Sequence, residues 1–186
     1  MRAFLDLEGS SLDRHSFPVE VAWVFEDGTG ESHLIRPAAR WVEWEPAAQW
    51  LHRIPLDLLE VDGSPVETIG RRLVDQLSDH EVYADAPSWD GDWLGILLRS
   101  AGLPGGALKL VDIDAGLEEL ARAILAPSLP SSQIPRATRR ILADASARFA
   151  GRPRAQRALA DARLSRERWL AVSGLAHAYR EESGIS

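Results

Sequence analysis

The chain begins with an apolar run in which acids occupy alternate positions. Phe4, Leu5 and Leu7 are apolar, whereas Asp6 and Glu8 carry carboxylates. Because successive side chains of a strand point to opposite faces, a strand here directs both acids to one side, about 7 Å apart. Charges in a buried strand are costly without a partner. The pattern is typical either of a divalent-cation site or of the solvent-exposed end of a strand, where neighbouring backbone groups or Arg side chains bind the acids.

Two more strand patterns follow. Residues 18–26 are rich in β-branched and aromatic side chains, residues 27–30 are a turn sequence, and residues 31–36 form another run. We therefore predict that the first three strands form a meander. The polar, Ser-containing connection over 9–17 is expected to cross the mouth of the site that the acids face.

The stretch 37–63 is irregular, with a short helix expected over 46–53. Its candidate contact residues are three Trp and one His: Trp41, Trp44, Trp50 and His52. Trp rings here either stack on nucleobases or pack the loop onto the domain; packing is favoured, with Trp41 and Trp44 the candidate exceptions. His52 is either a ligand-contacting or proton-transferring group or an exposed helix-end residue.

Helices and strands then alternate. A helix is predicted over 64–78, a short buried strand over 81–84, and a helix capped near Ser88 over the apolar stripe that follows. This alternation predicts an α/β fold, because each helix returns the chain to the sheet.

The last part of the chain is predicted to be mainly helical. A fifth strand is expected over 108–111, followed by a helix for which Asp112 and Asp114 are N-cap candidates. Beyond the loop 127–135 the sequence is rich in Ala, Arg and Leu, with an interruption at 151–153. No linker divides the chain, so we predict a single domain over residues 1–186.

Composition narrows the chemistry. The 186 residues are 45% hydrophobic and include seven Trp, which suffices for a sizeable core, and there is no Cys. Disulfides and thiolate metal sites are therefore excluded, and oxygen or imidazole ligands favour Mg²⁺ or Mn²⁺. The N-terminal apolar run is broken by acids and no stretch approaches 18 uncharged apolar residues, so a soluble, cytoplasmic protein without a membrane partner is expected.

Charge is unevenly distributed. The net charge is −7, yet residues 131–186 contain 11 Arg and only five acids, a net of +6, which leaves residues 1–130 at −13. A basic face beside an acidic, metal-binding half suits a ligand that bears phosphate. The alternative is an ordinary helix surface solvated by Arg.

Three motifs together resemble the DEDD (DnaQ-like) 3′–5′ exonucleases, the family of ribonuclease T and oligoribonuclease. The first is Phe4-Leu5-Asp6-Leu7-Glu8, followed by Pro18-Val19-Glu20-Val21-Ala22. The second is Trp89-Asp90-Gly91-Asp92-Trp93-Leu94, and the third is Gln156-Arg157-Ala158-Leu159-Ala160-Asp161-Ala162. The resemblance extends over about 160 residues and implies that Asp6, Glu8, Asp90 and Asp161 are the catalytic, metal-binding acids.

The third motif departs from the family pattern. The family's general-base His corresponds to Gln156, and Arg157 stands where a variant of the family has Tyr. Glutamine can orient a water molecule but cannot accept its proton near neutral pH. Gln156 is expected in the loop ahead of a helix, because on one regular helix it would lie about 140° from Asp161. His15 or His52 is a candidate substitute base.

The second motif departs as well, because Ala86 stands where relatives often have Asn. The resemblance implies a ribonuclease H-like fold, with a five-stranded mixed sheet and helices on both faces. It also implies two Mg²⁺ or Mn²⁺ ions and two-metal phosphodiester hydrolysis. Substrates would be single-stranded RNA or DNA 3′ ends, short oligonucleotides or nucleotides, and relatives suggest a homodimer. Candidate substrate-contacting residues are Leu7, Gly9, Ser10, His52, Trp89 and Arg157.

Three functions remain open from the sequence. The first is the active exonuclease, and the second is a catalytically weakened relative that binds nucleic acid or nucleotides in a regulatory role because of Gln156. The third is a structural or partner-binding domain whose acids do no metal chemistry.

Overall fold

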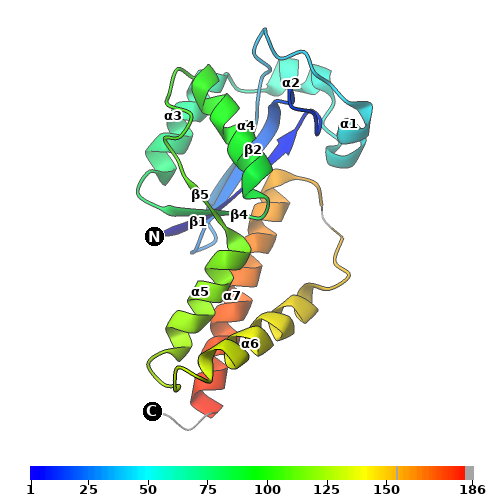
Figure 1. Cartoon of the computed structure of the whole chain (residues 1–186). Coiled ribbons are helices and arrows are strands. Elements are labelled where there is room, and N and C mark those ends of the chain that lie inside the picture. Colours follow the sequence, from blue (N-terminus) through cyan, green and yellow to red (C-terminus); the bar gives the residue numbers. More distant parts are fainter. Residues whose placement is uncertain (154, 183–186) are drawn as a thin grey trace.

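The computed structural model describes residues 1–153 and 155–182 (Figure 1). The strands are β1 (Arg2–Gly9), β2 (Pro18–Phe25), β3 (Gly30–Leu34), β4 (Glu81–Ala84) and β5 (Leu110–Asp112). The helices are α1 (Pro46–His52), α2 (Leu56–Asp62), α3 (Val66–Leu77), α4 (Pro87–Ser100), α5 (Ile113–Leu125), α6 (Ile134–Phe149) and α7 (Ala158–Glu182).

The five strands form one mixed sheet in the order β3-β2-β1-β4-β5. The pairs β1·β2 and β2·β3 are antiparallel, whereas β1·β4 and β4·β5 are parallel. The predicted meander of the first three strands is therefore confirmed. Because β1 and β4 are parallel, their carboxyl ends lie at the same edge of the sheet.

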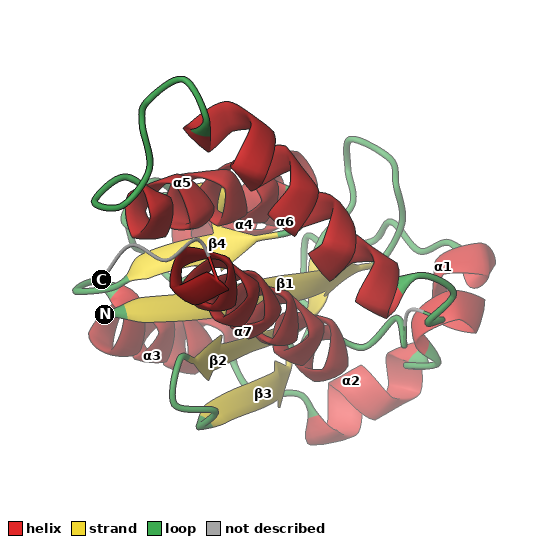
Figure 2. Cartoon of the chain, turned by 90° about the horizontal axis from the view of Figure 1, so that it is seen from below, coloured by secondary structure: helices red, strands yellow, loops and turns green. Residues whose placement is uncertain are grey.

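The alternation of β1 divides its side chains between two cores. Leu5 and Leu7 lie in a cluster built with α3 and α4, and Phe4 lies in a second cluster with residues of α5, α6 and α7. Figure 2 shows α7 crossing one face of the sheet and α3 lying behind it. The predicted ribonuclease H-like arrangement, a five-stranded mixed sheet with helices on both faces, is confirmed.

Several boundaries differ from the predicted ones. Helix α2 falls in the stretch that was expected to be irregular, and it buries a single apolar side chain, Leu59. Helix α4 begins at Pro87, next to Ser88 as predicted, but its N-cap residue is Ala86 and no side-chain cap forms. Pro is well suited to a first helical position. Asp112 is confirmed as the N-cap of α5, where it accepts N–H bonds from Asp114 and Ala115.

Helix α7 packs against the sheet with small side chains. Its buried face includes Ala158, Ala162 and Ser165 in the first turns and Trp169 further along. Small residues allow a helix axis to come close to the strands beneath it. Over the part of the chain that the structure describes, no helix has the length and apolar character needed to span a lipid bilayer.

Candidate active site

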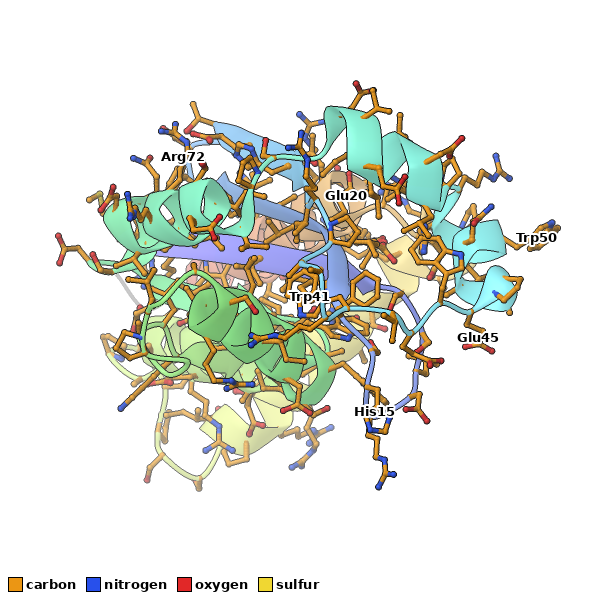
Figure 3. The ribbon with its side chains drawn as sticks, turned by 90° about the horizontal axis from the view of Figure 1, so that it is seen from above. His15, Glu20, Trp41, Glu45, Trp50 and Arg72 are labelled. Carbon is orange, nitrogen blue, oxygen red and sulfur yellow. The ribbon has the colours of Figure 1, made fainter. Side chains whose placement is uncertain are left out.

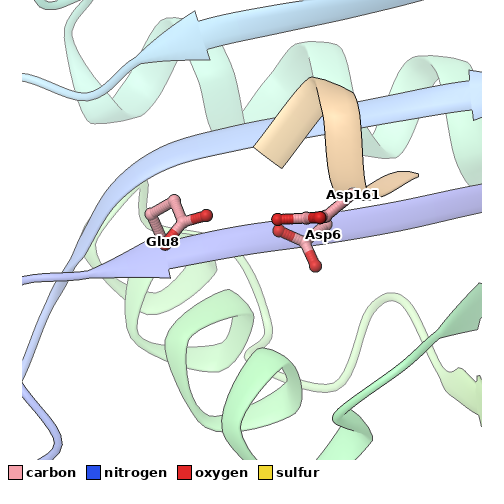
Figure 4. A group of neighbouring side chains, drawn as sticks. All are labelled: Asp6, Glu8 and Asp161. Carbon is pink, nitrogen blue, oxygen red and sulfur yellow. The ribbon is translucent and has the colours of Figure 1, made fainter. Parts of the chain in front are cut away.

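Three carboxylates converge at the carboxyl end of β1. Asp6 and Glu8 project from β1 and Asp161 from the first turn of α7, and one carboxylate oxygen from each lies within 4.8 Å of the other two (Figure 4). All three side chains are partly exposed. They come from two elements that are far apart in sequence, so the group exists only in the folded chain.

Local packing explains how Asp161 reaches β1. Asp6 lies on the same face as Phe4, toward α7, and its neighbour on β2 is Ala22, which is small and fully buried. Ala158 and Ala162 of α7 are also fully buried. The β1·β2 register shifts immediately after Glu8, an irregularity of the kind that redirects side chains beside active sites.

The surroundings of Glu8 disfavour the charged form of its carboxylate. Burial, followed by the charges of Asp161, Glu20 and Asp90, raises the Glu8 pKa from its ordinary 4.5 to about 8, and Arg157 offsets part of this effect. A cation among the acids would remove most of this repulsion. The raised pKa therefore marks a place where positive charge is favoured.

Glu20 is the buried neighbour of Glu8 on the adjacent strand. The two residues face each other across β1·β2, and the Glu20 side chain is only 2% exposed. Its carboxylate accepts two bonds from the Arg157 guanidinium, at 2.8 and 2.9 Å, and a third from the Ala158 N–H at 3.0 Å. Burial alone would raise the Glu20 pKa, but these bonds outweigh burial and hold the pKa below its usual value.

The donor set fits a hard divalent cation. Asp6, Glu8 and Asp161 offer only carboxylate oxygens, which Mg²⁺ and Mn²⁺ prefer, and Mg²⁺ is typically held by few carboxylates together with substrate phosphate oxygens. The separation of at most 4.8 Å leaves room for a cation between the oxygens. These three residues are therefore the candidate metal ligands.

Asp90 lies outside this group of three. It is 2% exposed in the first turn of α4 and accepts N–H bonds from Leu7 at 3.1 Å and from Ala86 at 3.3 Å. Burial raises its pKa to about 7, although the two bonds act in the opposite direction. In this structure Asp90 ties α4 to β1 from the face opposite α7, while its charge still acts on Glu8.

Gln156 lies where the sequence predicted it, in the loop directly ahead of α7. Its φ is 50°, in the left-handed region, whereas α7 begins at Ala158. The side chain is partly buried. Gln156 thus lies outside the regular helix that carries Asp161. This agrees with the prediction, since on one regular helix the two residues would lie about 140° apart.

The predicted substrate-contacting residues around β1 have structural partners. The Leu7 side chain enters the core on the face opposite the acids, and the Ser10 hydroxyl accepts the Phe17 N–H at 3.0 Å. Gly9 is required by Trp93, because a Cβ on Gly9 would lie 2.2 Å from the Trp93 ring. Trp89 is 38% exposed beside that ring, at 5.7 Å between centroids.

The other aromatic candidates are arranged differently from expectation. Trp41 and Trp44 pack on Phe17, whereas Trp50 is 81% exposed. His52 is 2% exposed rather than exposed, and burial lowers its pKa. Its Nδ1 accepts the Ile54 N–H at 3.1 Å. Neither His52 nor His15 belongs to the group of three acids.

A cavity of about 480 Å³ opens beside Asp161 between α6 and α7. Arg152 and Arg168 lie on its walls together with Asp85 and Asp114. Arg168 forms ion pairs with both of these acids, and Arg152 pairs with Glu167 at 2.9 Å outside the cavity wall. The cavity is within the usual size range of small-molecule sites.

Sequence reasoning assigned no role to Glu20, Asp85, Arg152 or Arg168. A signal existed for Glu20, because it is the only charge within the apolar run 18–25 and a buried charge requires a partner. No comparable signal marked the others. Their positions depend on how α5, α6 and α7 pack together.

No protein-family model matches the sequence, and no curated protein matches it. Solved structures do match. A structure of exonuclease I gives a TM-score of 0.62 at 16% identity, covering 98% of this chain and 42% of that chain. The E. coli enzyme in complex with a dA16 oligonucleotide gives 0.61 at 15% identity, with coverage of 98% and 42%. Exonuclease I from Methylocaldum szegediense gives 0.54 at 19% identity, with coverage of 69% and 30%.

This chain shares the fold of the matched part of exonuclease I. At these identities the likeness concerns the fold alone. The chain spans between about three tenths and two fifths of the length of these exonuclease I chains. Any activity, substrate or partner for this chain must therefore be argued from its own residues.

Proposed function

We propose that this protein is a metal-dependent 3′–5′ exonuclease that hydrolyses single-stranded nucleic acid or short oligonucleotides. The observation that carries the proposal is the convergence of Asp6, Glu8 and Asp161, with oxygens within 4.8 Å of one another. The exonuclease I fold supports it, because one of the matching structures is described as a complex with single-stranded DNA.

Asp6, Glu8 and Asp161 would hold the cation or cations, and Asp90 would contribute through its charge or as a further ligand. Bound Mg²⁺ or Mn²⁺ would supply activation of water and stabilisation of the attacking and leaving oxygens. The chain's own contribution is to orient these acids. Glu20 and Arg157 fix the start of α7, and Asp90 fixes the start of α4 against β1.

Substrate would enter beside Asp161. The adjoining cavity of about 480 Å³ can receive a nucleotide, and the Arg168 and Arg152 guanidinium groups on its walls are suited to phosphate oxygens. The pair Arg168–Asp114 involves an acid that is 74% exposed, so a phosphate can replace that acid at little cost.

A weakened, nucleic-acid-binding relative is the second candidate function. The observation that favours it is Gln156, an amide in the position of the family's general base, held just before α7. An amide accepts no proton near neutral pH, and loss of a general base typically slows a reaction by about 10²–10⁴-fold. Binding would then persist while turnover is slow.

Hydrolysis of a 5′-labelled single strand in Mg²⁺ or Mn²⁺ tests the proposal. The protein should shorten the strand from its 3′ end, and Asp6→Ala should abolish the activity. The matched control is Asp75→Ala, which removes an exposed carboxylate from α3 and should leave the rate unchanged. Activity that survives Asp6→Ala at the same level would overturn the proposal.

A further inference from the structure

A second cavity, of about 220 Å³, has three arginines among its lining residues. Three arginines and a histidine contribute to it together with two apolar residues: Arg14, His15, Arg40, Arg99, Trp41 and Ile96. Among the residues that the structure describes, no carboxylate lines this cavity. We call it the Arg14–Arg99 pocket.

The basic residues of the pocket come together from three separate segments. Arg14 and His15 belong to the loop after β1, Arg40 to the loop after β3, and Arg99 to the last turn of α4. Like charges that share a small space repel one another. In the described part of the chain, no salt bridge joins Arg14, Arg40 or Arg99 to a carboxylate.

The three arginines of the pocket come together within the acidic part of the chain. Residues 1–130 carry a net charge of −13, and all of the pocket's residues fall within that acidic part. Asp13 is the acidic neighbour of this loop: its carboxylate lies 3.0 Å from the His15 Nδ1 and also interacts electrostatically with Arg14, without forming a salt bridge to it.

The fold holds the pocket's walls in place. The Arg40 guanidinium donates to the Ser100 hydroxyl at 2.8 Å, and Trp41 stacks on Phe17 with ring centroids 5.2 Å apart. Arg99 lies close against Gly105, where a Cβ would be 2.6 Å from its Nη1. Arg40 and Arg99 thus contact neutral partners, so their charges remain available for an anion.

The pocket lies next to the loop that follows the acid site. Ser16 also lines the pocket, and its hydroxyl accepts a bond from the Trp93 indole, whose ring covers Gly9 directly after Glu8. Figure 3 shows His15 on this loop and Trp41 above α4 on the same side of the molecule. An extended chain that leaves the acids along this loop would therefore meet the pocket.

We infer that the Arg14–Arg99 pocket binds a phosphate group. Guanidinium groups bind phosphate oxygens through paired, charge-assisted bonds, and a volume of about 220 Å³ accommodates one phosphate rather than a whole nucleotide. If the proposed function holds, the phosphate is one of the backbone of the substrate strand. A free phosphate ion has the same chemistry, and the experiment separates the two sources.

Binding of a short fluorescein-labelled oligothymidylate is measured by anisotropy in EDTA, so that no hydrolysis occurs. The double variant Arg14→Gln/Arg40→Gln should bind about fivefold to tenfold more weakly, as expected for lost charge-assisted phosphate contacts. The slope of log affinity against log salt should fall by about 0.7 for each lost contact. The control is Arg71→Gln/Arg139→Gln, which removes two exposed arginines elsewhere and should change binding little.

Thermal melting in phosphate and in chloride at equal ionic strength supplies the second arm. Stabilisation by phosphate that the double variant loses, with oligothymidylate affinity unchanged, would assign the pocket to the free ion. Equal loss of affinity in pocket and control variants, together with no phosphate effect on melting, would overturn the inference. Arg14→Gln alone serves if the double variant melts early. Because binding is measured in EDTA without hydrolysis, its outcome is independent of the hydrolysis test with Asp6→Ala. Failure of this inference and failure of the proposed function can therefore be distinguished.

Discussion

Among the acids of the site, Glu8 is subject to both burial and repulsion by several neighbouring carboxylates. It faces Glu20 across the sheet and shares its surroundings with Asp161 and Asp90, and burial adds to these repulsions. A proton and a divalent cation relieve the same strain, so they compete for this carboxylate. Cation binding at Glu8 is therefore increasingly favoured as the pH rises toward the raised pKa of about 8.

We predict that Mg²⁺ raises the melting temperature more at about pH 9 than at about pH 6. Without metal, folded Glu8 keeps its proton up to about pH 8, whereas the unfolded chain releases it near 4.5. Metal-free stability therefore declines as the pH rises through this window, and bound Mg²⁺ restores it. Glu8→Gln should flatten the pH profile and reduce the Mg²⁺ effect. Equal Mg²⁺ shifts at both pH values would contradict the prediction.

In the proposed exonuclease, Gln156 is the residue that would limit the chemistry. Its φ of 50° lies in a region that His adopts more readily than most side chains do. A histidine can therefore be introduced without disturbing the backbone ahead of α7. The substitution then changes only whether a proton can be accepted at this position.

Gln156→His should increase the rate of single-strand hydrolysis by about 10²-fold, the lower end of typical general-base contributions. Initial rates at saturating substrate provide the measurement. Gln156→Asn is the matched control, because Asn also tolerates a positive φ but cannot act as a base. A similar rate for the His and Asn variants would mean that another group accepts the proton or that Gln156 does not face the reacting water.

At the element scale, the start of α7 determines whether the three acids meet. Glu20 of β2 binds both the Arg157 guanidinium and the Ala158 N–H, and Ser32 of β3 donates a further bond at 3.0 Å. A carboxylate at a helix N-terminus is also favoured by the helix dipole. Arg157, predicted to contact substrate, thus also anchors the helix that presents Asp161.

Arg157→Ala should destabilise the protein by about 3 kcal/mol, since it leaves the Glu20 carboxylate buried without its cation. Denaturant unfolding measures this change. The control Arg163→Ala removes an exposed arginine from the same helix and should cost less than about 0.5 kcal/mol. Because the Glu20 pKa is lowered, the contribution of Glu20 is present above about pH 4.5 and is lost as the pH falls further. An Arg157→Ala variant as stable as wild type would contradict the anchoring role.

At the scale of the whole molecule, charge is divided along the chain. The arginine-rich segment 131–186 forms α6 and α7, which cover the face that carries the acids, while the net charge stays at −7. Arginines are thus available near the candidate cleft, but the remaining surface repels a long polyanion.

We predict that a single strand is hydrolysed at least about tenfold faster than a blunt duplex of the same sequence, because a duplex offers more phosphates to an acidic surface and no free strand for the cleft. Both substrates carry a 5′ label and are compared in Mg²⁺. A duplex with a 3′ overhang is the control and should be shortened only to the junction. Equal rates on the blunt duplex and the single strand would contradict the prediction.

The sequence by itself determined most of the fold. Alternation in β1, β-branched and aromatic residues in β2, the turn at 27–30 and helical spacing in α3 are local patterns, and they predicted the meander and the α/β alternation. The helices on both faces were implied by the family resemblance. Asp6 and Glu8 on one strand face followed from the period of two. Short elements with little burial were missed, as for α2, because a helix that buries only Leu59 leaves a weak pattern.

Only the tertiary structure decided which acids meet. Asp161 joins Asp6 and Glu8 because α7 approaches β1 over small side chains, whereas Asp90 accepts backbone N–H groups across the opposite face. The ion pair between Glu20 and Arg157 and the Arg14–Arg99 pocket likewise join segments that are distant in sequence. Such distances depend on how elements pack, and packing sums contacts over the whole chain, whereas periodicity reports only which face each residue occupies.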